Sequence, residues 1–210
     1  FLREIPFTQG GLKIEGRVAY VEQDPIIFSG TVKSNILFGL EYNPTLYKTV
    51  VRACNLLPDF DQLDNKDETL VGEKGITLSG GQKARISLAR ALYSQSDIYL
   101  FDDPLSAVDS KVGRHLFNYA IRGQMLKDKV VVLVTHHLNY AKESDRVLLF
   151  SEGKIIGDGT FDELRVMENN LFSKFKEIED EEEKRKSTHK YSTLVKCSSN
   201  NGEKEKEEKG

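Results

Sequence analysis

Three short runs of consecutive β-branched, aliphatic and aromatic residues constrain the fold of this chain more than any other feature. They are Arg17–Val21, Ile98–Phe101 and Val130–Val134. Strands without alternation between apolar and polar positions are typical of parallel sheets that are covered on both faces. A fourth run, Val147–Phe150, is followed by Ser151–Lys154 and Ile155–Gly157, a pattern that predicts a hairpin. We therefore expect a mostly parallel central sheet.

Helical patterns between these runs place the chain in the α/β class. Apolar faces predict helices over Ala84–Tyr93 and Gly113–Ile121, and Thr45–Leu57 and Phe161–Phe175 are predicted as further helices. Residues 39–75 lack a strand pattern and predict a helical insert, which with the next helix covers about residues 39–95.

Composition divides the chain near Glu177. Residues 177–210 are dominated by Glu, Lys, Ser and Asn, so that they bury too little apolar surface to offset the entropy of ordering. We expect one ordered domain over residues 1–176, followed by a charged, disordered tail or linker over 177–210.

Charge, cysteine count and hydropathy exclude several classes of protein. The net charge of −3 gives no overall electrostatic case for binding nucleic acid or an anionic membrane surface. Two cysteines exclude a disulfide scaffold and fit a reducing compartment. No apolar run approaches the roughly 20 residues that span a bilayer.

The stretch Leu78–Gln82 opens the helix that runs to Tyr93. Ser79 and Gln82 have the spacing of a capping box. Gly80 and Gly81 would let an anion approach the backbone at the positive end of the helix dipole. By itself this pattern favours an ordinary capped helix.

Two other strand ends carry polar residues. The run Ile98–Phe101 ends in Asp102 and Asp103, where α/β folds bind ligands and where P-loop ATPases place an aspartate that helps to hold Mg²⁺. Asp103 could polarise an attacking water, although two adjacent acids are usually a polar strand end or a helix cap. His136 follows the run at 130–134. Taken by itself, a histidine in this position would be a structural residue or, together with His137, a metal ligand.

The run Leu78–Leu92 resembles the signature motif and signature helix of ATP-binding-cassette (ABC) ATPases, and further motifs agree with it. Asp102–Pro104 resembles the Walker B end, Ser106–Asp109 the D-loop, Val134–His136 the switch histidine, and Tyr20–Pro25 the Q-loop. The resemblance implies an ABC-type P-loop NTPase core that takes ATP and Mg²⁺.

The resemblance also implies a role for each residue. Asp103, His136 and Gln23 would be catalytic: Asp103 as base or water positioner, His136 as γ-phosphate sensor, and Gln23 as the link between the site and the insert. Asp102 and Gln23 would approach Mg²⁺. The residues that would meet ATP held between two such domains are Ser79, Gly80, Gly81, Gln82 and Asp109.

Two more segments resemble exporters within this superfamily. Ser29–Gly39 and Val71–Gly75 are similar to stretches that lie near the coupling helices of exporter membrane domains. Soluble members that act on DNA or ribosomes would carry coiled-coil heptads or basic arms between Gly39 and Gly75, and this sequence has neither. The expected partners are therefore a second nucleotide-binding domain and transmembrane domains, without nucleic acid, at the cytoplasmic face of a membrane.

Asp103 departs from most of the superfamily, which has Glu there. With Pro104–Asp109 after it, this aspartate resembles the first nucleotide-binding domain of subfamily C, the multidrug-resistance-associated transporters and the cystic fibrosis conductance regulator. A shorter carboxylate implies weak hydrolysis at this domain's own site. The alternative is a low-turnover regulatory module whose nucleotide gates a channel-like ABC protein.

No Gly-x-x-x-x-Gly-Lys-Ser/Thr loop occurs in these 210 residues. Family spacing places its lysine roughly half a dozen residues before Phe1. The chain also begins without Met or a signal pattern, so we expect a domain truncated at its amino end and inactive alone.

We predict that the isolated 210-residue chain shows no ATP-dependent rise in its melting temperature, because most phosphate contacts are absent from its sequence. Thermal unfolding with and without Mg-ATP measures this. Micromolar ATP binding in calorimetry would contradict the prediction.

Overall fold

The computed structural model describes residues 10–11, 13–73 and 75–166. The described part falls into two compact units, which divide between Val134 and Thr135. Each unit is described by itself.

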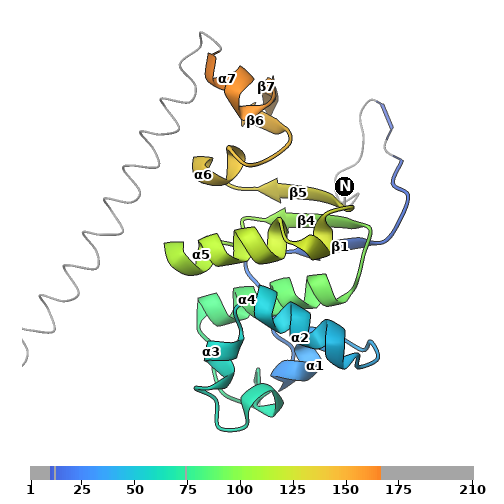
Figure 1. The fold of residues 1–210 in the computed structure, drawn as a ribbon, viewed down its shortest axis with the longest axis vertical. Helices are drawn as coiled ribbons and strands as arrows, with labels where there is room; N and C mark the ends of the chain where they lie inside the picture. The colour runs from blue at the N-terminus through green and yellow to red at the C-terminus, as the bar shows by residue number, and fades with distance from the viewer. Residues whose placement is uncertain (1–9, 12, 74, 167–210) are drawn as a thin grey trace, which may run out of the picture. The chain divides into compact units, whose positions relative to one another are not determined.

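A parallel sheet forms the centre of the first unit (Figure 1). Its strands are β1 (Val18–Val21), β4 (Ile98–Asp102) and β5 (Val130–Val134), in the order β1-β4-β5. Both pairs are parallel: β1 starts with Val18 opposite Ile98, and β4 ends with Asp102 opposite Val134. The three predicted strands and the parallel sheet are confirmed.

Only the central strand is covered on both faces. Tyr99, Leu100 and Phe101 of β4 are all buried. In β1, by contrast, Val18 and Tyr20 are 38% and 40% exposed. The expectation that all three strands are buried on both faces is therefore wrong for β1, and likewise for β5, whose two end residues are exposed. Each of these strands has a single strand neighbour among the described residues, so flanking elements cover it less completely.

The helix α4 (Gly80–Tyr93) packs against β1 on one side and against α1 (Val32–Leu37) and α2 (Pro44–Ala53) on the other (Figure 1). Its apolar residues are almost fully buried, among them Leu88, Ala89 and Leu92. α4 confirms the predicted helix and positions its first turn relative to the sheet.

The helix predicted over 113–121 has two parts. It begins as α5 (Ser110–Leu116) and continues as the π-helical turn η2 (Phe117–Ile121). The short helix η3 (Gln124–Leu126) then leads to β5. The predicted position is confirmed, with a change in helical pitch at Phe117.

α2 is shorter than predicted and ends at Ala53 instead of Leu57. Asn55 adopts a left-handed backbone with φ of 52°, which ends a right-handed helix. The chain restarts as α3 (Leu57–Phe60), where Pro58 occupies the first turn. The sequence predicts a helix that runs past Ala53 because an asparagine such as Asn55 is compatible with a helical sequence pattern as well as with a left-handed turn.

The insert contains helices but is not free of strands. After η1 (Lys66–Glu68), the two-residue strand β3 (Leu70–Val71) pairs antiparallel with β2 (Gly30–Thr31). The prediction that residues 39–75 contain no strand is wrong at this point. Two residues are too short to show a periodicity.

The second unit contains the predicted hairpin. After the short helix α6 (Leu138–Ala141), β6 (Val147–Ser151) and β7 (Lys154–Gly159) pair antiparallel. Glu152 and Gly153 between them both have positive φ, which favours the twist of a tight hairpin turn. The helix α7 (Phe161–Val166) covers the first part of the helix predicted over 161–175; the rest, and the tail at 177–210, lie outside the described residues.

No helix among the described residues is both long enough and apolar enough to cross a membrane.

Candidate functional site

The first turn of α4 is held by a reciprocal capping box. The Ser79 Oγ accepts the N–H of Gln82 at 3.2 Å, and the Gln82 Oε1 accepts the N–H of Ser79 at 2.9 Å. This confirms the predicted cap. Gly80 and Gly81 lie in the first turn, so their N–H groups have no carbonyl acceptor within the helix. Both glycines are at least partly exposed, and these N–H groups are therefore available to an anion.

Ser79 keeps a hydrogen-bond donor for a ligand. Its oxygen accepts a bond from the backbone, so its hydroxyl proton can be donated outward. Gln82 differs, because its Oε1 is bound to Ser79 and its Nε2 donates to Asp59 at 3.3 Å. The structure thus gives Gln82 a role in holding the turn, while its predicted contact with nucleotide stays a prediction.

The predicted D-loop lies directly against the first turn of α4. We call this turn the signature turn, because it lies in the stretch that resembles the signature motif. A Cβ built on Gly81 would lie 3.2 Å from the carbonyl oxygen of Ala107 and 3.6 Å from a methyl carbon of Val108. A Cβ on Gly80 would lie 3.8 Å from the Ala107 Cβ. The missing side chain at Gly81 permits this close approach, which brings two predicted site segments together.

Asp109 at the end of the D-loop caps α5. Its Oδ1 accepts the N–H groups of Lys111 and Val112, each at 3.0 Å. The bond from Val112 in particular keeps the pKa of this carboxyl below its ordinary value, so it stays charged at neutral pH. Its predicted contact with nucleotide stays a prediction.

Asp102 lies at the carboxyl end of β4 and is half-buried. The Tyr20 hydroxyl, from β1, donates to the Asp102 Oδ2 at 3.2 Å. Mg²⁺ in phosphate-binding enzymes is typically held by one or two carboxylates together with substrate phosphates. A single partly exposed carboxylate with one oriented oxygen fits this requirement, and the described residues hold no cluster of three or more His, Cys, Asp or Glu.

Asp103 is buried and has an unusual backbone. Its φ of 44° is left-handed, a conformation that is uncommon outside glycine. Its N–H donates to the carbonyl of Val134 at 3.0 Å, and its carbonyl accepts the Ser106 hydroxyl at 2.9 Å. The turn therefore ties β4, the end of β5 and the D-loop together, and such strained residues cluster at functional sites.

Gln23 and His136 follow the other two strands. Gln23 is exposed, two residues after the end of β1. His136 is exposed, two residues after β5 in the second unit, with its ring 4.3 Å from that of His137. Since the strands are parallel, the carboxyl ends of β1 and β4 put Gln23 and Asp102 at one edge of the sheet. The roles predicted for Gln23, Asp102, Asp103 and His136 stay predictions.

Sequence reasoning missed an acidic residue beneath the signature turn. Asp59, on α3, is buried and accepts bonds from Nε and Nη2 of Arg85 at 2.6–3.0 Å. Arg85 lies within the stretch that resembles the signature helix, but its partner is 26 positions away and no local pattern points to it.

A second missed pair connects α4 to the segment after Gln23. Arg90 donates to the carbonyl and side-chain oxygens of Asn35 at 2.9 and 3.0 Å. The same guanidinium lies 5.1 Å from the Phe28 ring centroid and 5.0 Å from that of Phe38. Asn35 in turn bonds to both the N–H and the carbonyl of Phe28. These contacts fix the chain that follows the predicted Q-loop against the last turn of α4.

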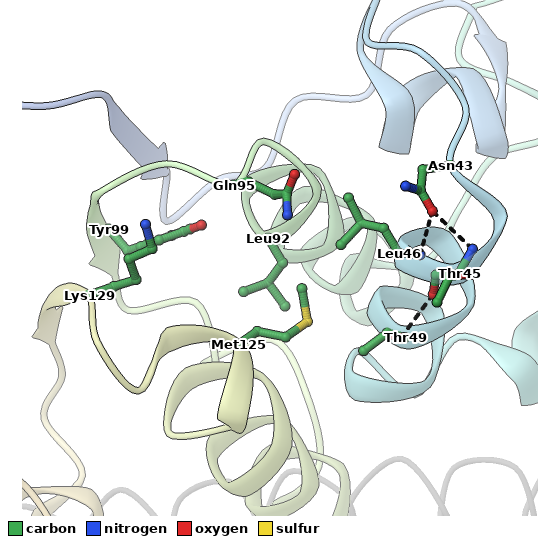
Figure 2. Close-up of a pocket in the computed structure, with 9 residues that line it drawn as sticks. All are labelled: Asn43, Thr45, Leu46, Thr49, Leu92, Gln95, Tyr99, Met125 and Lys129. Carbon is green, nitrogen blue, oxygen red and sulfur yellow. Dashed lines mark hydrogen bonds between the residues drawn. The ribbon is translucent and has the colours of Figure 1, made fainter.

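A cavity of about 410 Å³ lies elsewhere in the first unit (Figure 2). Leu92 and Met125 point toward each other across it, with Tyr99 and Lys129 at one side and Asn43, Thr45 and Thr49 at the other. Tyr99 and Lys129 lie near the amino ends of β4 and β5, away from Asp102 at the carboxyl end. No predicted site residue lines this cavity.

Comparison with known proteins agrees with the resemblance to ABC ATPases that the sequence motifs indicate. The ABC transporter family matches residues 4–106. The chain is 50% identical to ATP-binding cassette sub-family C member 4 of Mus musculus over 162 residues, which are 77% of this chain and 12% of that protein. It is 48% identical over 177 residues to multidrug resistance protein mrp-7 of Caenorhabditis elegans, covering 84% of this chain and 12% of that protein. The chain thus spans about an eighth of the length of these relatives.

We predict that Ser79→Ala lowers the free energy of unfolding by about 1 kcal/mol, because the N–H of Gln82 loses its cap. Ser79→Asp should retain nearly full stability, since aspartate caps helices as well as serine does. Chemical denaturation of the three proteins measures both effects. Equal stability of Ser79→Ala and the wild type would contradict the capping role.

Proposed function

Because this chain belongs to the ABC transporter family and forms part of a nucleotide-binding domain of the subfamily C type, we propose that the complete domain, in the full-length protein, binds and hydrolyses ATP with Mg²⁺. In this proposal, ATP is held between this domain and a second nucleotide-binding domain. Closure of the two domains drives transport through membrane domains.

The first turn of α4 is the observation that carries the proposal. It contains no acidic residue, although acids are the usual choice at a helix N-terminus. The first-turn N–H groups of Gly80, which is exposed, and Gly81, which is partly exposed, with the hydroxyl of the exposed Ser79, would form an anion site of the right polarity for a triphosphate. The nucleotide would be the one seated on the opposite domain, so that this turn completes the partner's site.

Asp102 would hold Mg²⁺ at the carboxyl edge of the sheet. When bound, Mg²⁺ neutralises charge on the β- and γ-phosphates. The Tyr20 hydroxyl donates a hydrogen bond to the Asp102 Oδ2 and thereby orients the carboxylate. Gln23, exposed after β1, would approach the same region and connect it to the insert.

Asp103 and His136 would act on the γ-phosphate. Asp103 would accept a hydrogen bond from the attacking water and position it, as a carboxylate base does. Its side chain is one methylene shorter than Glu and is buried, both of which favour slow hydrolysis at this domain's own site. His136 would donate a hydrogen bond to the γ-phosphate and report its presence.

We propose membrane domains as the second partner. They would dock on a surface that is formed by the segment after Gln23. Exposed apolar side chains gather along this segment: Ile26, Phe28, Phe38, Leu40 and Tyr42. Arg90 and Asn35 fix Phe28 to α4, so a partner docked here would be mechanically linked to the signature helix. This partner would place the domain at the cytoplasmic face of a membrane.

A low-turnover regulatory module is the second candidate function. The short, buried carboxylate of Asp103 favours it, because nucleotide would then stay bound and hold the domains closed. In that case ATP occupancy would gate a membrane pathway with little hydrolysis.

The first functional prediction uses the variant that keeps the helix cap. In the full-length protein, Ser79→Asp should reduce ATP turnover roughly tenfold or more, because its carboxylate repels the triphosphate. Ser144→Asp, at an exposed serine outside the proposed site, is the matched control and should leave turnover unchanged. Wild-type turnover in Ser79→Asp would exclude α4 as the anion site.

A second prediction concerns the shortened carboxylate. Asp103→Glu should raise turnover at this domain's site by about tenfold if the full-length protein is active, because the longer side chain reaches the water. Asp128→Glu, at an exposed position, is the control. An unchanged or lower rate would count against the weakened-base interpretation.

A further inference from the structure

We propose that Asp59, on the insert helix α3, is a positioning residue that fixes the signature turn in its ATP-binding orientation. The inference rests on the proposed function, because it assumes that this turn meets the partner domain's nucleotide. It adds a residue that touches no nucleotide, lies outside the signature stretch and acts through two side chains of α4.

The first connection runs through Arg85. Asp59 accepts the Arg85 Nε at 3.0 Å on Oδ2, and Arg85 Nη2 at 2.6 Å on Oδ1 and 2.8 Å on Oδ2. Both side chains are only 12% exposed. A fork of this kind fixes the guanidinium in direction as well as in distance, and a buried carboxylate cannot lose its partner without a large cost.

The second connection runs through Gln82. Its Nε2 donates to the Asp59 Oδ1, which leaves its Oε1 to accept the N–H of Ser79. A carboxylate can only accept hydrogen bonds, so Asp59 dictates which end of the amide faces Ser79. The cap of α4 thereby depends on a residue 20 positions before Ser79 in the chain.

Arg85 also packs against Gly81 in the signature turn. A Cβ on Gly81 would lie 3.4 Å from the Arg85 Nη1 and 3.2 Å from the carbonyl oxygen of Ala107. Gly81 is therefore confined between the guanidinium that Asp59 holds and the D-loop. A displacement of Asp59 would shift the turn whose N–H groups face the nucleotide.

α3 makes Asp59 responsive to the insert. The helix is one turn long, from Leu57 to Phe60, and Phe60 next to Asp59 is buried in the insert. Motion of α3 would consequently reach the signature turn through a single carboxylate. We infer that Asp59 couples the position of the insert to the affinity of the partner's ATP site.

The test compares Asp59→Asn with Asp61→Asn in the full-length protein. Asp61 is exposed and directly follows the same helix as its C-cap, so the same substitution there serves as a matched control. Asn retains the shape of Asp but presents an N–H₂ group to one of two donors, Arg85 or Gln82. ATP affinity at each of the two nucleotide sites is measured by photolabelling with an azido-ATP and separating the two domains.

We expect Asp59→Asn to weaken labelling of the partner domain's site by about tenfold and to leave labelling of this domain's own site unchanged. Asp61→Asn should change neither. A merely structural role would weaken both sites together, and that result, or no change at the partner site, would overturn the inference. Arg85→Lys keeps the charge but loses the fork; it should give the same selective loss, and it decides the question if Asp59→Asn fails to fold.

Ser79→Asp in the same assay separates this inference from the proposed function. If Ser79→Asp weakens the partner site and Asp59→Asn does not, the positioning role is wrong and the proposed function stands. If Ser79→Asp also leaves the partner site unchanged, the signature turn does not meet that nucleotide, and both are wrong.

Discussion

The orientation of the first turn of α4 is the constraint on which the proposed site depends. Its free N–H groups can bind an anion only if the turn stays exposed and keeps its direction. Three features secure this: the reciprocal bonds of Ser79 and Gln82, the buried fork between Asp59 and Arg85, and the close approach of Ala107 to Gly81. The site is thus preorganised by contacts on the side that faces the protein, and the side that faces solvent is left to the ligand.

α4 also connects the two regions through which such a domain would communicate. Its first turn contacts the D-loop, and Arg90 near its end binds the segment after Gln23 through Asn35 and Phe28. The first connection is a close packing contact, and the second consists of hydrogen bonds and cation–π contacts; both join elements far apart in the chain. A movement at the exposed apolar surface would therefore be transmitted along a single rigid helix to the signature turn.

Much of this arrangement could be predicted from sequence, because it depends on local patterns. Continuous apolar runs gave the correct strands, spacing gave the Ser79–Gln82 cap, and alternation with turn residues gave the β6–β7 hairpin. The missed features are long-range or irregular. The Asp59–Arg85 pair joins residues 26 positions apart, Asn55 ends α2 by a left-handed turn, and exposure of β1 depends on its neighbours in space. No periodicity encodes such features.

Trapping of the nucleotide beside Ser79 tests the central claim most directly. Ser79→Cys in the full-length protein would be incubated with an ATP analogue that carries a thiol-reactive group on its γ-phosphate. The account predicts a covalent adduct that requires the partner domain's phosphate-binding loop and disappears when that loop is mutated. Reaction of Cys at 144, introduced by Ser144→Cys, to the same extent, or an adduct that survives loss of the partner's loop, would contradict it.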